Sequence, residues 1–317
     1  MNILLFSFNA IFPMFIPIAL GWFIFWKGHI KEPDINFLNR LCFRYLLPFH
    51  IFNSTLAIDF YAEFNPGMIL LCSLSIFGVM VVSWIIFALT IGNRARRCIL
   101  IASAFRSNNL IYALPLAANL FGETGIKSAV MLVPITIILF NLFTVVVMVY
   151  HAQDGKTGMK ETLKHTLVDI VTNPLLIGSV LGIVLSLLHI AIPVSLKSGL
   201  NAIAVSATPV SLLLLGAQID FKKLSGSLGP ALGACILRLV IVPVILVPLM
   251  IYAGFRGPEL GALMVAFAAP CAVTNLVMAR NYNIDPPFAA QTVYLSTVMS
   301  IFTLFGAISL LRALELF

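Results

Sequence analysis

The sequence predicts an all-α membrane protein with ten transmembrane helices, arranged as two inverted repeats of five helices. Three observations predict this fold class. Of 317 residues, 61% are hydrophobic and only 10% are charged, and the mean hydropathy is +1.06. The apolar residues fall into ten long stretches. Similar segments recur in the two halves of the chain at a nearly constant distance.

The composition argues against a soluble globular protein, because such chains carry about 25% charged residues. Lipid is the solvent that tolerates so few charges. The net charge of +7 does not indicate a nucleic-acid partner, because the basic residues lie in short loops and form no patch with interleaved aromatics. The five cysteines are far apart and include no C-x-x-C pair, so no disulfide framework, metal site or cofactor is expected.

Ten stretches are long enough to cross a hydrocarbon core of about 30 Å, which takes about 20 apolar residues in a helix. Charged or turn-forming residues separate most of them. The first is interpreted as an uncleaved helix, because it has neither a basic leading segment nor a cleavage-site pattern. The predicted spans are 3–26, 35–56, 66–91, 97–121, 126–150, 167–189, 199–219, 228–253, 259–281 and 286–311.

A polar stretch at 151–166 is interpreted as a linker between a first repeat at 1–150 and a second repeat at 167–317. The loops that follow odd-numbered spans carry eleven Lys and Arg residues, and the loops on the other side carry four. Basic loops stay in the cytoplasm, so the linker is predicted to be cytoplasmic and both termini to lie outside. The expected location is the cytoplasmic (inner) membrane, in contact with lipid.

Four pairs of segments indicate an internal repeat, with offsets of 157, 161, 164 and 162 residues. Because each half has an odd number of spans, the second half enters the membrane from the opposite side, and the repeats are inverted. Inverted repeats allow two related conformations that open to opposite sides, which is the basis of alternating access. The pairs are Pro17–Gly21 with Pro174–Gly178, Pro48 with Pro209, Pro66 with Pro230, and 104–105 with 266–267.

Spans four and nine contain the candidate binding residues. Each has a proline near its middle, Pro115 and Pro270, which removes a helical hydrogen bond and predicts a break. Half-helix N-termini at such breaks attract anions. The alternative is a pair of kinks with polar groups that pack helices; their repeat-related positions favour binding. Four polar residues lie beside the prolines: Asn108, Asn109, Thr274 and Asn275.

Arg106 is a charged residue well inside span four, and an intramembrane charge indicates function. It can pair with a substrate carboxylate. Two alternatives stay open, snorkelling to the cytoplasmic face and pairing within the bundle. No Asp or Glu falls near the middle of a span, so the site is expected to be neutral to positive and to suit an organic anion. Arg238 in span eight has no evident partner in the sequence.

Five segments, in their order and spacing, resemble the auxin efflux carrier family, which includes plant auxin exporters and bacterial organic-acid carriers and belongs to the bile-acid/auxin transporter superfamily. Span four departs from the family pattern at Leu110 and Ala113, which replace small or glycine positions. The resemblance covers essentially the whole chain. The segments are Leu38–Phe52, Asn108–Leu116, Leu215–Ile219, Arg238–Pro243 and Ala269–Tyr282.

The resemblance implies an elevator-type permease in which spans four and nine are broken and cross, with the anion bound where they cross. It places Asn108 and Pro115 on one side of the anion and Pro270 and Cys271 on the other. Tyr112, in the same matching segment of span four, is a further candidate. Spans one, two, six and seven are expected to form a scaffold and the interface of a homodimer.

The expected function is secondary transport of a mono- or dicarboxylate, with H+ or Na+ as the possible coupling ion. Two alternatives stay open: a bile-acid-type sodium symporter, which shares the broken crossing helices, and a channel or ligand sensor on the same scaffold. An enzyme is not expected and no catalytic residue is predicted, because the sequence has no H-E-x-x-H or G-x-S-x-G motif and no paired membrane aspartates.

Overall fold

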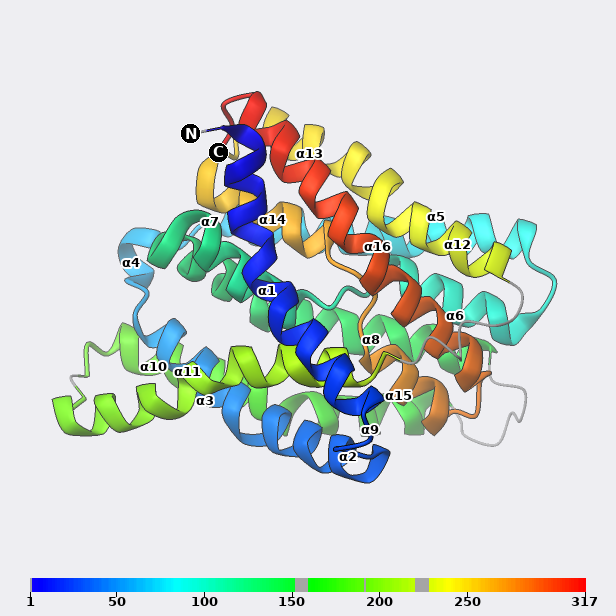
Figure 1. Cartoon of the computed structure of the whole chain (residues 1–317), viewed down its shortest axis with the longest axis horizontal. Coiled ribbons are helices and arrows are strands. Elements are labelled where there is room, and N and C mark those ends of the chain that lie inside the picture. The colour runs from blue at the N-terminus through cyan, green and yellow to red at the C-terminus, as the bar shows by residue number, and fades with distance from the viewer. Residues whose placement is uncertain (1, 152–158, 191, 220–227) are drawn as a thin grey trace.

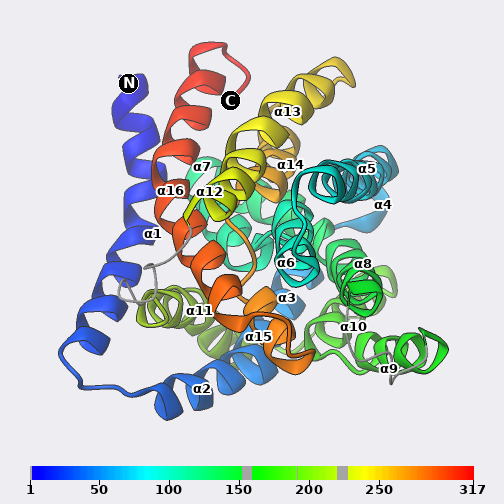
Figure 2. The same cartoon turned by 90° about the vertical axis from the view of Figure 1, so that its right-hand side faces the viewer.

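The computed structural model describes residues 2–151, 159–190, 192–219 and 228–317, and these residues form a helical protein (Figure 1). Within them, β pairing is limited to an isolated antiparallel bridge between Ser107 and Cys271. The prediction of an all-α fold is confirmed for this part of the chain. The two termini lie at the same end of the molecule, as Figure 2 also shows.

The helices of the first half begin with α1 and continue to α8. Their bounds are α1 (Ile3–Trp26), α2 (Glu32–Leu41), α3 (Leu47–Leu56), α4 (Phe60–Glu63), α5 (Pro66–Thr90), α6 (Arg94–Phe105), α7 (Asn109–Met131) and α8 (Val133–His151). The second half contains α9 (Met159–Val171), α10 (Pro174–Leu187), α11 (Val194–Ala217), α12 (Leu228–Ile236), α13 (Val242–Tyr252), α14 (Gly257–Ala268), α15 (Thr274–Asn281) and α16 (Pro286–Ala313).

Six continuous helical stretches of the described residues are long and apolar enough to cross a membrane, or seven if the bent pair α9 and α10 forms one span. They are α1, α5, α8, α11, α16 and the stretch Leu228–Tyr252, which contains α12 and α13. This is consistent with a multi-pass membrane protein. The other predicted spans are divided into shorter helices, so the count of ten and the inverted repeat stay predictions. The helix α9 begins at Met159, inside the predicted linker 151–166, and is bent by 52° against α10. Residues 152–158 of that linker lie outside the described part.

Two π-helical segments, Cys42–Leu46 and Leu237–Ile241, join α2 to α3 and α12 to α13. Each is followed closely by a proline, Pro48 or Pro243. The pyrrolidine ring clashes with the carbonyl four residues earlier and provides no N–H. A widened turn before the proline relieves that clash, so both long helices continue with a local change of helical twist.

Glycines allow two pairs of long helices to pack with their backbones nearly in contact. The helix α1 packs along α11, and α3 packs along α10. A Cβ atom at Gly216 would lie 1.8 Å from the carbonyl oxygen of Ile18, and one at Gly178 would lie 2.6 Å from that of Pro48. Any side chain at these positions would force the helices apart, so the close packing of each pair depends on glycine.

Candidate functional site

Two interruptions of helical structure lie against each other in the middle of the protein. The helix α6 ends at Phe105 and α7 begins at Asn109, while α14 ends at Ala268 and α15 begins at Thr274. The backbone N–H of Asn108 donates to the carbonyl of Pro270 at 2.8 Å, and that of Ala272 donates to the carbonyl of Arg106 at 3.2 Å. These two non-helical segments, 106–108 and 269–273, are called the crossover below.

Arg238, from the π-helical segment after α12, lies fully buried behind the crossover. Its guanidinium donates to the carbonyls at the ends of both interrupted helices. The acceptors are Ala104 at 3.1 Å and Phe105 at 3.4 Å in α6, and Ala266 at 2.7 Å and Ala269 at 3.1 Å at the end of α14. Both helices can therefore end inside the protein without leaving these carbonyls unpaired.

Sequence reasoning missed this role of Arg238. A signal was present, because a buried arginine in a span with no carboxylate nearby in the chain needs neutral acceptors for its donors, and unpaired backbone carbonyls at helix ends are such acceptors. The tertiary position of those carbonyls, more than a hundred residues away in α6, could not be derived from the sequence.

Cys271 points into the protein and is held by neighbouring helices. Its backbone N–H donates to the hydroxyl of Ser296 in α16 at 3.1 Å, and its thiol donates to the carbonyl of Ser103 in α6 at 3.3 Å. The hydroxyl of Ser103 in turn donates to that of Thr292 at 3.3 Å. Hydrogen bonds to α6 and α16 thus fix the shape of the crossover around Cys271.

Several polar side chains at the crossover are buried without a hydrogen-bond partner in the described part of the protein. The atoms are Oγ of Ser107, Nδ2 of Asn108, Oδ1 of Asn109, and both Oδ1 and Nδ2 of Asn275. None of these four residues is more than 7% exposed. A buried polar group without a partner costs about 1–3 kcal/mol, so a cluster of them is typical of a site that a ligand or water completes.

Arg106, at the end of α6, is 6% exposed and has neutral partners. Its guanidinium donates to Oδ1 of Asn141 in α8 at 3.0 Å and to Sδ of Met278 in α15 at 3.1 Å. The ion pairs of the described residues, Arg96–Asp285 and Lys127–Glu63, do not involve it. Its side chain does not snorkel to the surface, and its positive charge lies at the crossover without an ion-pair partner among the described residues.

The remaining predicted residues occupy different positions relative to the break. Pro270 lies within the crossover, and its carbonyl accepts the bond from Asn108. Thr274 is the half-buried first residue of α15. Tyr112 is fully buried in α7.

Pro115 does not mark the break in span four. It lies inside α7, and the chain is instead interrupted at 106–108. The expectation that both prolines sit at the breaks is therefore wrong for Pro115. A proline inside a helix removes a single hydrogen bond and kinks the helix without ending it. The end of α6 is instead supported by the hydrogen bonds from Arg238 and by those to the segment 269–273.

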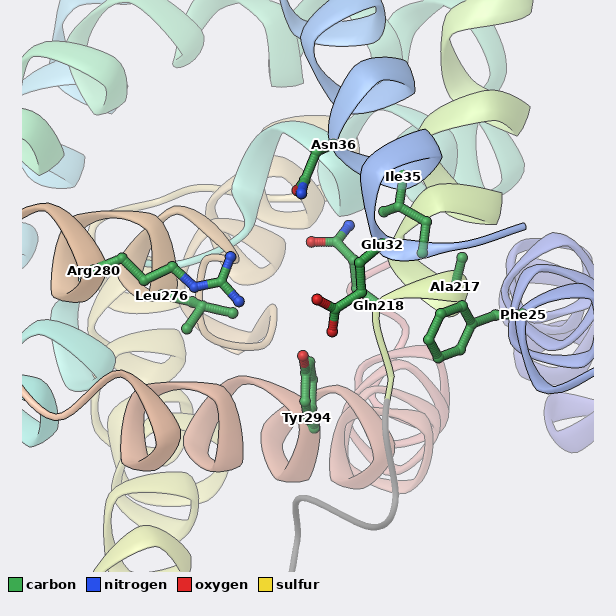
Figure 3. A pocket seen from close by; sticks show the side chains of 9 residues that line it. All are labelled: Phe25, Glu32, Ile35, Asn36, Ala217, Gln218, Leu276, Arg280 and Tyr294. Carbon is green, nitrogen blue, oxygen red and sulfur yellow. The ribbon is translucent and has the colours of Figure 1, made fainter. Parts of the chain in front are cut away.

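A small cavity lies beside α15, between α1, α2 and α11 on one side and α15 and α16 on the other. Its volume is about 50 Å³, and it reaches Leu276, the neighbour of Asn275. The polar ends of Glu32, Gln218, Arg280 and Tyr294 point into it (Figure 3). Ligand pockets have volumes of about 300 Å³ or more, so in the present conformation this cavity is large enough for water and too small for an organic acid.

Comparison with known proteins gives a consistent result along nearly the whole chain. Residues 6–308 match the family described as "Membrane transport protein". The chain is 22% identical over 302 residues to an uncharacterized transporter of Methanothermobacter thermautotrophicus, covering 94% of this chain and 96% of the relative. It is 23% identical to the uncharacterized transporter YfdV of Escherichia coli K12, covering 89% and 90%. It is 20% identical to auxin efflux carrier component 5 of Arabidopsis thaliana, covering 92% and 93%.

Proposed function

The chain belongs to the family of membrane transport proteins, and from that premise we propose that it is a secondary carrier of a small organic anion, a mono- or dicarboxylate. Its relatives are named transporters or carriers, so it is a membrane transporter and not an enzyme. The anion would bind at the crossover. The observation that carries this proposal is the cluster of buried, unpartnered amide groups beside Arg106.

The electrostatics of the crossover support a negative ligand. Each helix end carries a partial charge of about half an elementary charge, positive at the N-terminus and negative at the C-terminus. Arg238 binds the C-terminal carbonyls of α6 and α14. The N-termini of α7 and α15 have no anionic side chain in their first turns, and the Arg106 guanidinium adds a full positive charge nearby. A carboxylate would be attracted by all three.

The packing of helices supports two inverted five-helix repeats. With the spans numbered as in the sequence, α1 belongs to span one and packs on α11 of span seven. In the same way α10, of span six, packs on α3 of span two. Likewise α5 packs on α6, which pairs spans three and four, and α13 packs on α14, which pairs spans eight and nine. Each contact has a counterpart five spans later, as a repeat requires.

An elevator movement would carry the crossover past a scaffold made of α1, α2, α3, α10 and α11, which we also propose as the homodimer face. The small cavity lies between that scaffold and α15 with α16. Glu32 follows span one, and Gln218 and Arg280 lie at the C-terminal ends of spans seven and nine. The basic loops after these odd-numbered spans would place this cavity on the cytoplasmic side, with both termini outside. The helices would have to move apart there to admit a substrate.

The proposal is tested by thermal-shift measurements on purified protein with a panel of mono- and dicarboxylates. A ligand that binds only the folded protein raises its melting temperature by mass action. A saturable increase with carboxylates, but not with amines or sugars of similar size, is expected. A panel in which cations or neutral compounds stabilise the protein and carboxylates do not would contradict an anion carrier.

Asn108→Ala is expected to abolish stabilisation by the carboxylate while the protein stays folded. The side-chain nitrogen of Asn108 donates to no described group, so its removal breaks no internal bond there. Asn119→Ala in α7, the helix that follows Asn108, is the matched control, because Nδ2 of Asn119 donates to the carbonyl of Ala10 at 2.8 Å. That variant should melt at a lower temperature but bind normally. Normal binding by the Asn108 variant would exclude Asn108 from the site.

A further inference from the structure

Arg238 occupies a position that is unusual for an arginine inside a membrane protein. Its side chain is 0% exposed, and three of its nitrogens donate to four backbone carbonyls at distances from 2.7 to 3.4 Å. The carbonyls come from two helices that are far apart in the sequence, α6 and α14, and both helices end at this point. The guanidinium thus connects the two interrupted helices.

The charge of Arg238 is balanced by backbone dipoles. Neither ion pair of the described residues includes Arg238. The C-terminus of a helix carries about −0.5 of an elementary charge, so two such ends supply about −1, which matches one guanidinium. This balance explains how a charged side chain can lie fully buried here.

The same set of oxygens is what a transported cation would use. In carriers with inverted repeats, unwound carbonyls and the C-terminal ends of half-helices coordinate the coupling Na+ or H+ at the midplane. In this protein the carbonyls of Ala104, Ala266 and Ala269 already accept hydrogen bonds from Arg238. A metal ion placed among them would also be repelled by the guanidinium.

We propose that Arg238 is a built-in cation of the crossover, which takes the place of a coupling sodium ion and makes the carrier independent of sodium at this site. The inference rests on the proposed carrier function and deepens it, because it concerns the ion and not the anion. Arg238 acts as a positioning residue, since it holds the ends of α6 and α14 in place and does not reach the unpartnered amides.

The test measures the melting temperature in different cations and needs no substrate. The wild-type protein should melt at the same temperature in NaCl and in choline chloride of equal ionic strength. R238A leaves the four carbonyls without a donor, and its melting temperature should fall by more than about 5 °C. Low-millimolar guanidinium should restore much of that loss, because the free ion can enter the space left by the side chain.

R256A is the matched control. The guanidinium of Arg256 also donates to backbone carbonyls, those of Ile251 at the end of α13 and of Phe255 in the loop that follows, but it lies at the surface. Guanidinium should not stabilise this variant. Equal responses of R238A and R256A would show that the rescue is not specific to the crossover.

Two results would overturn the inference. One is a saturable stabilisation of the wild-type protein by Na+ over choline, because the crossover would then take sodium with Arg238 in place. The other is a folded R238A that guanidinium does not stabilise. If R238A does not fold, R238K keeps a cation near the carbonyls and should fold with a lowered melting temperature and no response to Na+. If neither variant folds, the wild-type comparison alone decides.

These measurements separate the two proposals. Failure of every carboxylate to bind would contradict the anion carrier and leave the cation results unchanged. A sodium response would contradict the role of Arg238 and leave the carboxylate results unchanged.

Discussion

Arg106→Gln is expected to weaken carboxylate binding at least tenfold while the protein stays folded. A hydrogen bond to a charged group contributes about 1.5–3 kcal/mol, which corresponds to roughly a 10- to 150-fold change in the dissociation constant. Arg106 is buried beside the unpartnered amides, and its present partners, Asn141 and Met278, are neutral. A carboxylate at the crossover would therefore be the first anionic partner of its guanidinium.

The measurement compares the carboxylate with its neutral primary amide in titrations of the wild type and the variant. Binding of the acid should weaken far more than binding of the amide. Arg44→Gln is the control, because Arg44 lies in the π-helical segment before α3 and carries the same charge away from the crossover. If the acid and the amide lose affinity equally, Arg106 supports the local structure and does not recognise the charge.

Gly216→Ala is expected to cost at least about 3 kcal/mol of stability and to remove most of the monodisperse protein, since overpacking alone typically costs 1–3 kcal/mol. A Cβ at this position would lie 1.8 Å from the carbonyl oxygen of Ile18 and 2.6 Å from its carbonyl carbon. Backbone atoms cannot rotate away as a side chain can. The helices α1 and α11 would have to separate along their contact, which also contains Gly21 facing Leu213.

Gly199→Ala is the control, because it makes the same change in the same helix. A Cβ at Gly199 meets nothing within 4 Å. Alanine favours a helix over glycine by up to about 1 kcal/mol, so this variant should be neutral or slightly more stable. Size-exclusion profiles and melting curves in detergent measure both variants. Equal yields and equal melting temperatures would contradict the close contact of α1 with α11.

Much of the candidate site could be predicted from local sequence. Asn108, Asn109 and Asn275 stand out because uncharged polar groups are conspicuous in apolar stretches. The structure buries all three, and each has at least one side-chain amide atom without a hydrogen-bond partner among the described residues. Pro270 lies between α14 and α15, whereas Pro115 lies inside α7. The sequence shows which residue cannot donate a hydrogen bond but not whether the surrounding helix tolerates that loss.

The sequence by itself determined that this protein is a helical membrane transporter, because hydropathy and the order of family motifs are properties of the chain read in one dimension. Only the tertiary structure decided where α6 and α14 end and what binds their last carbonyls. Arg238 donates to carbonyls at both ends, with the shortest bond to Ala266 in α14 and further bonds to α6. Folding brings these carbonyls to Arg238. Folding likewise decided the partners of Arg106. Packing places the neutral side chains of Asn141 and Met278 against its guanidinium, and not a carboxylate of the described residues.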